Sequence, residues 1–309
     1  MVEQSSQSLS STACKALEEC YGLVDVEITP LPGVAPTNFK VESKKCKYFL
    51  KRYQVGEKLV AQFHAALLVH YEKNLIPIAS VVPLTSGDLI LSVDDSHYVL
   101  QQYLSSPPLS ELPVAAERLA EAGRLLGRIH QCGGPKDIEC PYLGTLWNME
   151  NLDKLLALIE KKKNKFTVGS YAVVDSFARK WRRERPDFTV LDRTFIHNDF
   201  HKDNMLFEGN RCEAVIDFGE SVPGCRIVDV AVSLMYLSSL ESPPNKVFSQ
   251  FLRGYSEIYS ITEQERRYLP LLVRARAVIT FALNRFEYNR SKDGAFRVLV
   301  NEDLETYLS

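Results

Sequence analysis

Carboxylate and amide side chains gather in one short stretch of the chain, residues 195–220. Asp199 precedes Asn204 there, and Asp217 follows after two apolar runs. Amide and carboxylate oxygens suit Mg²⁺, a hard cation that takes one or two protein groups together with substrate phosphates. A further carboxylate nearby could accept the proton of an attacking hydroxyl. These residue types predict a phosphoryl-transfer site, with Asn204 and Asp217 as metal ligands and Asp199 acting on the acceptor.

The element that must position these groups is a β-hairpin. Two apolar runs flank a Glu-Gly-Asn-Arg segment at 208–211, whose Gly and Asn tolerate the positive φ of a tight reversal. A turn centred between its Asn and Arg pairs Met205 with Ile216. In the same register Asn204 faces Asp217, so the hairpin is expected to bring the two metal ligands together.

The spacing resembles the kinase catalytic loop, His-x-Asp-x-x-x-x-Asn followed by Asp-Phe-Gly, with His197 and Phe218 in matching places. In detail the stretch is similar to the aminoglycoside phosphotransferase and choline kinase family, whose loop reads His-Gly-Asp-x-His-x-x-Asn. Asn198 departs from that Gly, although Asn also visits left-handed conformations. The resemblance implies an ATP-dependent small-molecule kinase with ATP and Mg²⁺ as cofactors.

Length and composition fit two lobes. The chain has 309 residues, of which 45% are hydrophobic and 25% are charged, ordinary values for a globular protein. No apolar run approaches the roughly 18 residues that span a bilayer. The polar start at residues 1–11 lacks the apolar core of a secretory signal. We therefore expect neither a membrane span nor secretion.

Net charge and cysteine content limit the kinds of partner and the cellular compartment that the sequence predicts. The 37 basic and 39 acidic residues give a formal net charge of −2, which leaves no electrostatic footprint for nucleic acid. The 7 cysteines, an odd number without a Cys-x-x-Cys pair, argue against a disulfide framework or a zinc site. A cytoplasmic protein is predicted, whose partners are ATP and a small-molecule acceptor and not nucleic acid or membrane.

The amino-terminal part, residues 1–104, is predicted to be a β-rich lobe built as a meander and not as a Rossmann unit. Helical spacing is confined to Thr12–Tyr21 and Gly56–Lys73. A Ser and Pro segment at 105–108 then forms a linker. Short extended patterns predict strands at 24–31, 39–42, 46–53, 79–83, 89–93 and 97–102.

The remainder, residues 105–309, is predicted to be a mainly helical lobe that carries the catalytic loop and the acceptor site. Asp229 resembles the family's helix-start Asp that hydrogen-bonds the catalytic loop, and His130 is interpreted as a packed or capping histidine. The order of lobes is that of the α+β, bilobal protein-kinase-like fold, and the resemblance covers nearly the whole chain. Helices are predicted at 113–131, 152–163, 170–185, 226–240, 245–259, 262–288 and 297–308.

The resemblance also implies a nucleotide site in the β-rich lobe. Lys51 stands where the family places the lysine that holds the α- and β-phosphates. The partner of this lysine stays open, because His64 occupies the usual glutamate position and Glu57 and Glu72 are alternatives. The implied nucleotide contacts are Lys51, Gly33 and Asn38 at the phosphate loop, and the hinge strip Gln101, Gln102, Tyr103 and Leu104.

Two other functions compete with a small-molecule kinase. A protein kinase is disfavoured because the segment from Asp217 to Asp229 is too short for an activation segment and Ala-Pro-Glu is missing. A catalytically inactive nucleotide-binding module is favoured by the missing helix glutamate. It is opposed by the presence of Lys51, Asp199, Asn204 and Asp217.

Glu220 directly follows the Asp-Phe-Gly segment, where a side chain should face the acceptor. A carboxylate beside a cation that already balances the phosphates is explained by an amine on the substrate. A solvent-exposed loop glutamate is the alternative interpretation. The acceptor stays open among an aminoglycoside, homoserine, hydroxylysine, choline and a sugar, and Glu220 favours an amine-bearing alcohol.

Overall fold

The computed structural model describes residues 9–31, 37–44, 46–141, 143–288, 298 and 303–308. The chain divides into two compact units. The first contains the chain up to Ser105 together with Pro135–Pro141, and the second contains Ser106–Gly134 and the chain from Tyr142 onward. The predicted phosphate-loop residue Gly33 and most of the helix predicted at 297–308 lie outside the described residues.

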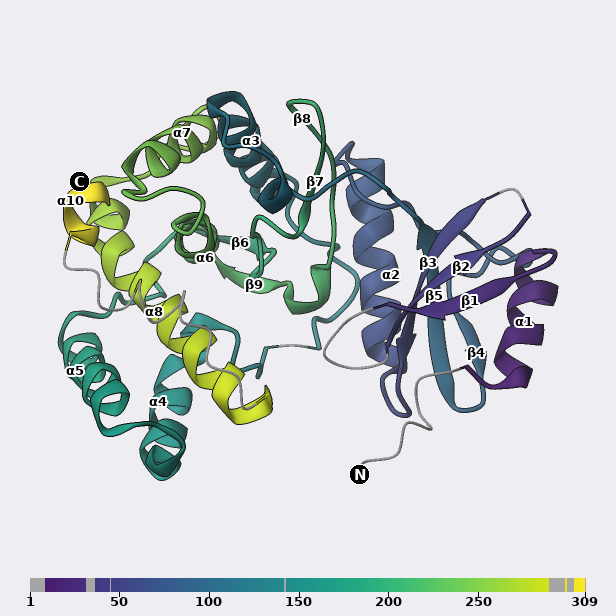
Figure 1. Ribbon diagram of the computed structural model, residues 1–309, viewed down its shortest axis with the longest axis horizontal. Helices are drawn as coiled ribbons and strands as arrows, with labels where there is room; N and C mark the ends of the chain where they lie inside the picture. The colour runs from purple at the N-terminus through teal and green to yellow at the C-terminus, as the bar shows by residue number, and fades with distance from the viewer. Residues whose placement is uncertain are drawn as a thin grey trace. The chain divides into compact units, whose positions relative to one another are not determined.

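A five-stranded antiparallel sheet forms the first unit, in the order β1-β2-β3-β5-β4 (Figure 1). The predicted strand at 79–83 is wrong, because that segment makes an isolated bridge between Val81 and Gln101 and two backbone hydrogen bonds to β5, too few for a regular strand. It is bounded by Pro77 and Pro83, which have no N–H to donate to a ladder. The strands are β1 Glu27–Pro30, β2 Asn38–Glu42, β3 Lys47–Tyr53, β4 Leu91–Val93 and β5 Ser96–Gln102.

Helices α1 (Ser11–Tyr21) and α2 (Lys58–Lys73) cover opposite faces of this sheet (Figure 1). Leu17 of α1 packs in one cluster with Leu50 and other buried apolar side chains. Side chains alternate along a strand, so Tyr53 points to the other face, where its hydroxyl lies 2.6 Å from His64 Nδ1 of α2. Lys51 shares this α2-side face with Tyr53.

The second unit is mainly helical, which confirms the α+β order of a β-rich part followed by a helical part. Two small antiparallel sheets accompany the helices: β6 (Arg193–Ile196) with β9 (Val222–Cys225), and β7 (Met205–Glu208) with β8 (Arg211–Val215). The described helices are α3 Ala116–Cys132, α4 Leu152–Lys161, α5 Val168–Glu184, α6 Arg226–Leu237, α7 Asn245–Ser256, α8 Glu263–Tyr288 and α10 Leu304–Leu308.

Helix α6 is the centre of the second unit. All but one of its residues are buried, and it contacts α7, α8, β6 and β9. Figure 1 shows it end-on, with the other helices of the unit around it. Around it, α3 and α7 cross closely. A Cβ atom on Gly254 would lie 1.9 Å from the carbonyl oxygen of Ala120, so only glycine permits this approach.

No described helix of either unit combines the length and the apolar character that crossing a bilayer requires.

Candidate active site

The β7-β8 hairpin that carries the predicted metal ligands forms, but with a different turn. Glu208 pairs with Arg211, which leaves Gly209 and Asn210 as the two turn residues. Gly209 has a φ of 61°, a left-handed conformation that glycine adopts without a Cβ clash. The centre of the turn is thus one residue earlier than predicted.

A β-bulge within the hairpin also changes its register. The shift lies between Leu206 and Phe207, and Met205 pairs with Val215 and not with Ile216. The predicted cross-strand pair of Asn204 with Asp217 is therefore wrong. Instead the carbonyl oxygen of Asn204 accepts the N–H of Ile216 at 3.0 Å, so this backbone bond ties Asn204 to the residue that precedes Asp217.

Asn204 and Asp217 present different kinds of oxygen. Asn204 is buried, and its Nδ2 donates to the carbonyl oxygen and to Oδ2 of Asp199 at 3.0 and 3.3 Å. Both bonds use the amide nitrogen, so the amide oxygen is the atom that a cation would take. Asp217 is exposed and has a left-handed backbone, with φ 60° and ψ 64°, at the start of a single 3₁₀ turn.

Asp229 hydrogen-bonds the backbone of the catalytic loop, as the resemblance implies. The two carboxylate oxygens of this buried residue accept the N–H groups of His197 and Asn198 at 2.7 and 2.8 Å. His130 is a packed histidine, as predicted, with Nε2 lying 3.1 Å from Asp229 and Nδ1 lying 2.9 Å from the Tyr255 hydroxyl. This buried chain of contacts supports the backbone of the loop at two successive residues.

His197 joins the loop to the end of the hairpin. Its ring packs on Phe218 with centroids 4.5 Å apart, and its Nε2 lies 3.2 Å from the carbonyl oxygen of Ile216. Burial lowers the pKa of His197 and favours the neutral imidazole, despite the opposing charges of nearby carboxylates. The arrangement is that of a structural histidine.

Asp199 lies between two cationic side chains. Arg276 Nη2 donates to its Oδ1 at 2.6 Å, and His201 Nε2 lies 3.3 Å from its Oδ2. Burial would raise the pKa of Asp199, but the charges of His201 and Arg276 outweigh it and hold the pKa well below its usual range. Burial likewise opposes ionisation of His201, yet Asp199 raises its pKa to about 9. Asp199 is therefore an ionised, oriented carboxylate.

Arg276 is the residue that sequence reasoning missed. It lies on α8, 77 positions after Asp199, and it is 1% exposed. Two basic residues, Arg274 and Arg276, inside an otherwise apolar stretch of a predicted helix were the available signal.

Glu220 is half-buried and points its carboxylate at a neighbour in the same unit. Its Oε2 accepts the Thr145 hydroxyl at 3.2 Å. Burial raises the pKa of Glu220 to about 7, the Thr145 hydrogen bond opposes this shift, and the charge of Asp199 adds to it. Glu220 is thus not the solvent-exposed loop glutamate of the alternative interpretation.

The predicted nucleotide contacts lie in the first unit. Lys51 of β3 pairs across the sheet with Asn38 of β2 and with Val99 of β5. Gln101 and Gln102 end β5, and Tyr103 and Leu104 follow it. The Lys40 ammonium lies 5.7 Å from the centre of the Tyr103 ring.

The three candidate partners of Lys51 each have another contact. His64 bonds the Tyr53 hydroxyl, as described above. Glu57 accepts the N–H of Gln54 at 2.6 Å, and Glu72 accepts the hydroxyl of Ser80 at 2.7 Å. The identity of the lysine's partner stays a prediction.

Replacing Lys51 by Met is expected to raise KM for ATP and to lower kcat together. A lysine that contacts phosphates stabilises both the bound nucleotide and the transition state, so each constant should change by about tenfold or more. Steady-state kinetics with varied ATP measures both. Lys47→Met is the matched control, because Lys47 lies on the same face of β3 but pairs with Glu42 at 3.3 Å. Unchanged constants for Lys51→Met would remove Lys51 from the phosphate site.

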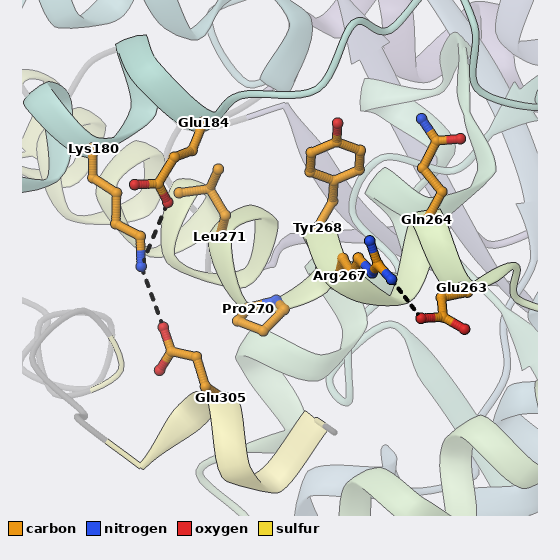
Figure 2. Close-up of a pocket in the computed structure, with 9 residues that line it drawn as sticks. All are labelled: Lys180, Glu184, Glu263, Gln264, Arg267, Tyr268, Pro270, Leu271 and Glu305. Atoms are coloured by element: carbon orange, nitrogen blue, oxygen red, sulfur yellow. Dashed lines mark hydrogen bonds and ion pairs between the residues drawn. The ribbon is translucent and has the colours of Figure 1, made fainter.

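A pocket of about 630 Å³ lies elsewhere on the second unit, along α5 and α8 (Figure 2). Its charged side chains pair with one another: Lys180 lies 3.4 Å from Glu305, and Arg267 lies 2.7 Å from Glu263. Exposed ion pairs of this kind contribute little free energy. None of the predicted site residues lines this pocket.

Amide and carboxylate oxygens at the hairpin lie next to an ionised carboxylate on the catalytic loop, which is the set of groups that the sequence predicts for phosphoryl transfer. The comparisons with known proteins agree. A model of the phosphotransferase enzyme family matches residues 27–270, so the chain belongs to this family. It is an ATP-dependent small-molecule kinase.

The relatives share modest identity with this chain over most of their length. Hydroxylysine kinase of Mus musculus is 24% identical over 305 residues, which cover 85% of this chain and 78% of that protein. Homoserine kinase of Polaromonas naphthalenivorans is 23% identical over 267 residues, which cover 85% and 82%. Among solved structures, an amicoumacin kinase in complex with AMP-PNP, Ca²⁺ and Ami matches with a TM-score of 0.71 at 15% identity, covering 97% of this chain and 94% of that one.

Proposed function

We propose that this kinase transfers the γ-phosphate of ATP to a hydroxyl group of a small molecule that carries an amine. The observation that carries the proposal is the half-buried carboxylate of Glu220, oriented by Thr145 and electrostatically coupled to Asp199. Desolvating a carboxylate costs free energy unless a cation or hydrogen-bond donors compensate it. A substrate ammonium supplies that compensation.

Asp199 is the residue proposed to meet the acceptor hydroxyl. Its low pKa makes it a weak base toward a neutral hydroxyl, so its first task is to orient that group. Phosphoryl transfer passes through a loose transition state and depends mostly on positioning and electrostatics. The hydroxyl becomes acidic only as its bond to phosphorus forms, and Asp199 then accepts the proton.

Mg²⁺ fits the oxygen atoms at the hairpin. The Asn204 amide oxygen and the Asp217 carboxylate would hold it, and the described residues contain no cluster of three or more His, Cys, Asp or Glu side chains of the kind that forms an all-protein metal cage. A cation there neutralises phosphate charge when ATP is bound. Lys51 and the hinge strip, Gln101 to Leu104, are the proposed nucleotide contacts of the first unit.

Hydroxylysine and homoserine, which name the relatives' activities, are both amino alcohols. They make an amine-bearing acceptor the first class to test. The test is ATP consumption against a panel of amino alcohols, amino acids, aminoglycosides and sugars, with the mass of each product measured. Each amine should be paired with its deaminated analogue. A preferred acceptor without an amine would refute the proposal, and binding of Mg²⁺-ATP without any turnover would favour the inactive module.

Glu220→Gln is expected to raise KM for the acceptor by about tenfold or more and to leave KM for ATP nearly unchanged. The loss corresponds to one charge-assisted hydrogen bond. Because the pKa of Glu220 is about 7, the wild-type acceptor KM should also rise as the pH falls through about 7 and the carboxylate is protonated. The variant should lack this pH dependence.

The matched control for Glu220 is Glu208→Gln. Glu208 lies on the nearby hairpin, but its side chain is 72% exposed and pairs with Arg211 at the surface. This control should keep the wild-type acceptor KM. Equal acceptor KM values for the wild type and Glu220→Gln would exclude Glu220 from amine recognition.

A further inference from the structure

Arg276 donates hydrogen bonds to two successive residues of the catalytic loop. Its Nη2 donates to Asp199 Oδ1 at 2.6 Å, and its Nη1 donates to the carbonyl oxygen of Asn198 at 3.2 Å. One rigid guanidinium group therefore fixes both the carboxylate of Asp199 and the peptide that precedes it. This contact joins α8 to the loop across a long stretch of sequence.

The guanidinium is itself enclosed. It lies 5.0 Å from the Trp147 ring centre and 5.5 Å from the Tyr236 ring centre. Nη1 donates to the carbonyl oxygen of Trp147 at 3.4 Å, and Nη2 donates to the Tyr236 hydroxyl at 3.3 Å. The four Nη hydrogens of an arginine thus meet four acceptors, and Nε is buried. The Nη donors are thus all used, and Nε, which has no hydrogen-bond partner among the described residues, is too buried to reach a substrate carboxylate.

Asn198 explains why the loop needs this support. It has a left-handed backbone, with a φ of 63°, where the family's loop has glycine, and this conformation costs free energy for a residue with a Cβ atom. Its side-chain amide is buried and makes no hydrogen bond to any described residue. The conformation is instead held through the backbone, by Asp229 at the N–H and by Arg276 at the carbonyl oxygen.

The two oxygens of Asp199 are held unequally. Oδ1 has the short bond to Arg276, whereas the contacts of Oδ2 with His201 and Asn204 are both 3.3 Å long. Both lone pairs of Oδ2 therefore have only long contacts, and a donor that approaches Oδ2 closely can displace one of them. An acceptor hydroxyl is such a donor.

We infer that Arg276 is a positioning residue for Asp199, which fixes the carboxylate and the strained Asn198 peptide so that Oδ2 faces the acceptor hydroxyl. Arg276 does not itself bind the acceptor. The inference rests on the proposed function, in which Asp199 acts on that hydroxyl.

The first test compares Arg276→Gln with Arg285→Gln. Arg285 lies on the same helix, over the Phe281 ring at 4.8 Å, with a buried Nε and a bond from Nη1 to the carbonyl oxygen of Lys165. Both variants lose an arginine that packs on aromatic rings, buried at Arg276 and half-buried at Arg285, so their melting temperatures report the cost of losing that packing. Only Arg276→Gln should lower kcat, by about 10- to 100-fold with KM for both substrates nearly unchanged, the scale of losing a group that orients an active residue.

The second test is a double-mutant cycle with Asp199→Asn. If Arg276 acts through the Asp199 carboxylate, Arg276→Gln should cost almost nothing further once that carboxylate is gone. An equal fold-loss of kcat in both backgrounds would overturn the inference. So would a rise in acceptor KM at unchanged kcat, because this would make Arg276 a substrate-binding residue.

Crystal structures separate this inference from the proposed function. A wild type that phosphorylates no amine-bearing acceptor refutes the proposed function, while the position of Asp199 in the wild type and in Arg276→Gln still tests Arg276. We expect the carboxylate to change rotamer in the variant, and an unchanged carboxylate would refute positioning. If Arg276→Gln does not fold, Arg276→Lys replaces it as the test. Arg276→Lys keeps the positive charge but loses the planar guanidinium group, and the same crystal structures and kinetic measurements apply to it.

Discussion

Asp217→Ala is expected to abolish Mg²⁺-dependent nucleotide binding. Asp217 is the one charged protein ligand proposed for the metal, whereas Asn204 offers only a neutral amide oxygen. Removing the charge leaves a doubly charged cation with phosphate oxygens, water and one dipole. Isothermal titration calorimetry with ATP, in Mg²⁺ and in EDTA, measures the metal-dependent part of the affinity. In the variant the two titrations should coincide.

The backbone at Asp217 requires a matched second variant. Its φ of 60° is tolerated by Asp and Asn better than by Ala, so Asp217→Ala also strains the turn. Asp217→Asn keeps the shape and the left-handed preference and removes only the charge. Both variants should lose metal-dependent binding, and Asp217→Asn should keep the wild-type melting temperature. If Asp217→Asn keeps Mg²⁺-dependent affinity for ATP, the assignment of Asp217 as a metal ligand is wrong.

Elements set by local patterns were predictable from the sequence. The first helix was predicted at Thr12–Tyr21 from its spacing. It is found at Ser11–Tyr21, where the Ser10 side chain accepts the N–H of Ala13 and Gly22 has a left-handed φ of 66°. Helix α8 was predicted at 262–288 and begins one residue later. Capping and amphipathic spacing involve neighbours in sequence, so they can be read without the fold.

The hairpin register could not be predicted in the same way. Its turn sequence contains two adjacent residues, Gly209 and Asn210, that both tolerate positive φ, and the choice between turn centres depends on the whole ladder. A bulge then shifts the pairing of Met205 by one residue. A bulge is a property of two strands together, so the pattern of either strand alone does not show it.

The residues from distant segments that contact Asp199 and Glu220 could not be predicted from the sequence either. Catalytic-loop spacing predicted Asp199, Asn204 and Asp217 as site residues, because those residues lie close in the chain. Arg276 and Thr145 come from segments far away in sequence, and only the packing of the second unit brings them to Asp199 and Glu220. The charge state of a buried carboxylate depends on such neighbours, so its pKa could not be argued from the sequence.

Asp199→Ala is expected to lower kcat by about two to four orders of magnitude, the range typical of losing a positioned base. Nucleotide affinity should stay nearly unchanged, because the proposed nucleotide and metal contacts are Lys51, Asn204 and Asp217. Stopped-flow or steady-state kinetics gives kcat, and calorimetry gives the affinity for Mg²⁺-ATP. A wild-type kcat would remove Asp199 from its proposed role.

The alanine variant has a second consequence that the structure defines. It leaves Arg276 buried at 1% exposure without the carboxylate that balances its charge, and an uncompensated buried charge destabilises the folded state. Asp199→Asn keeps an oxygen for Arg276 and is therefore the better measure of chemistry. If Asp199 acts as orienting group and late base, Asp199→Asn should lose nearly as much kcat as Asp199→Ala while it unfolds at a higher temperature. Recovery of most of the activity in Asp199→Asn would instead show that the carboxylate serves only to neutralise Arg276.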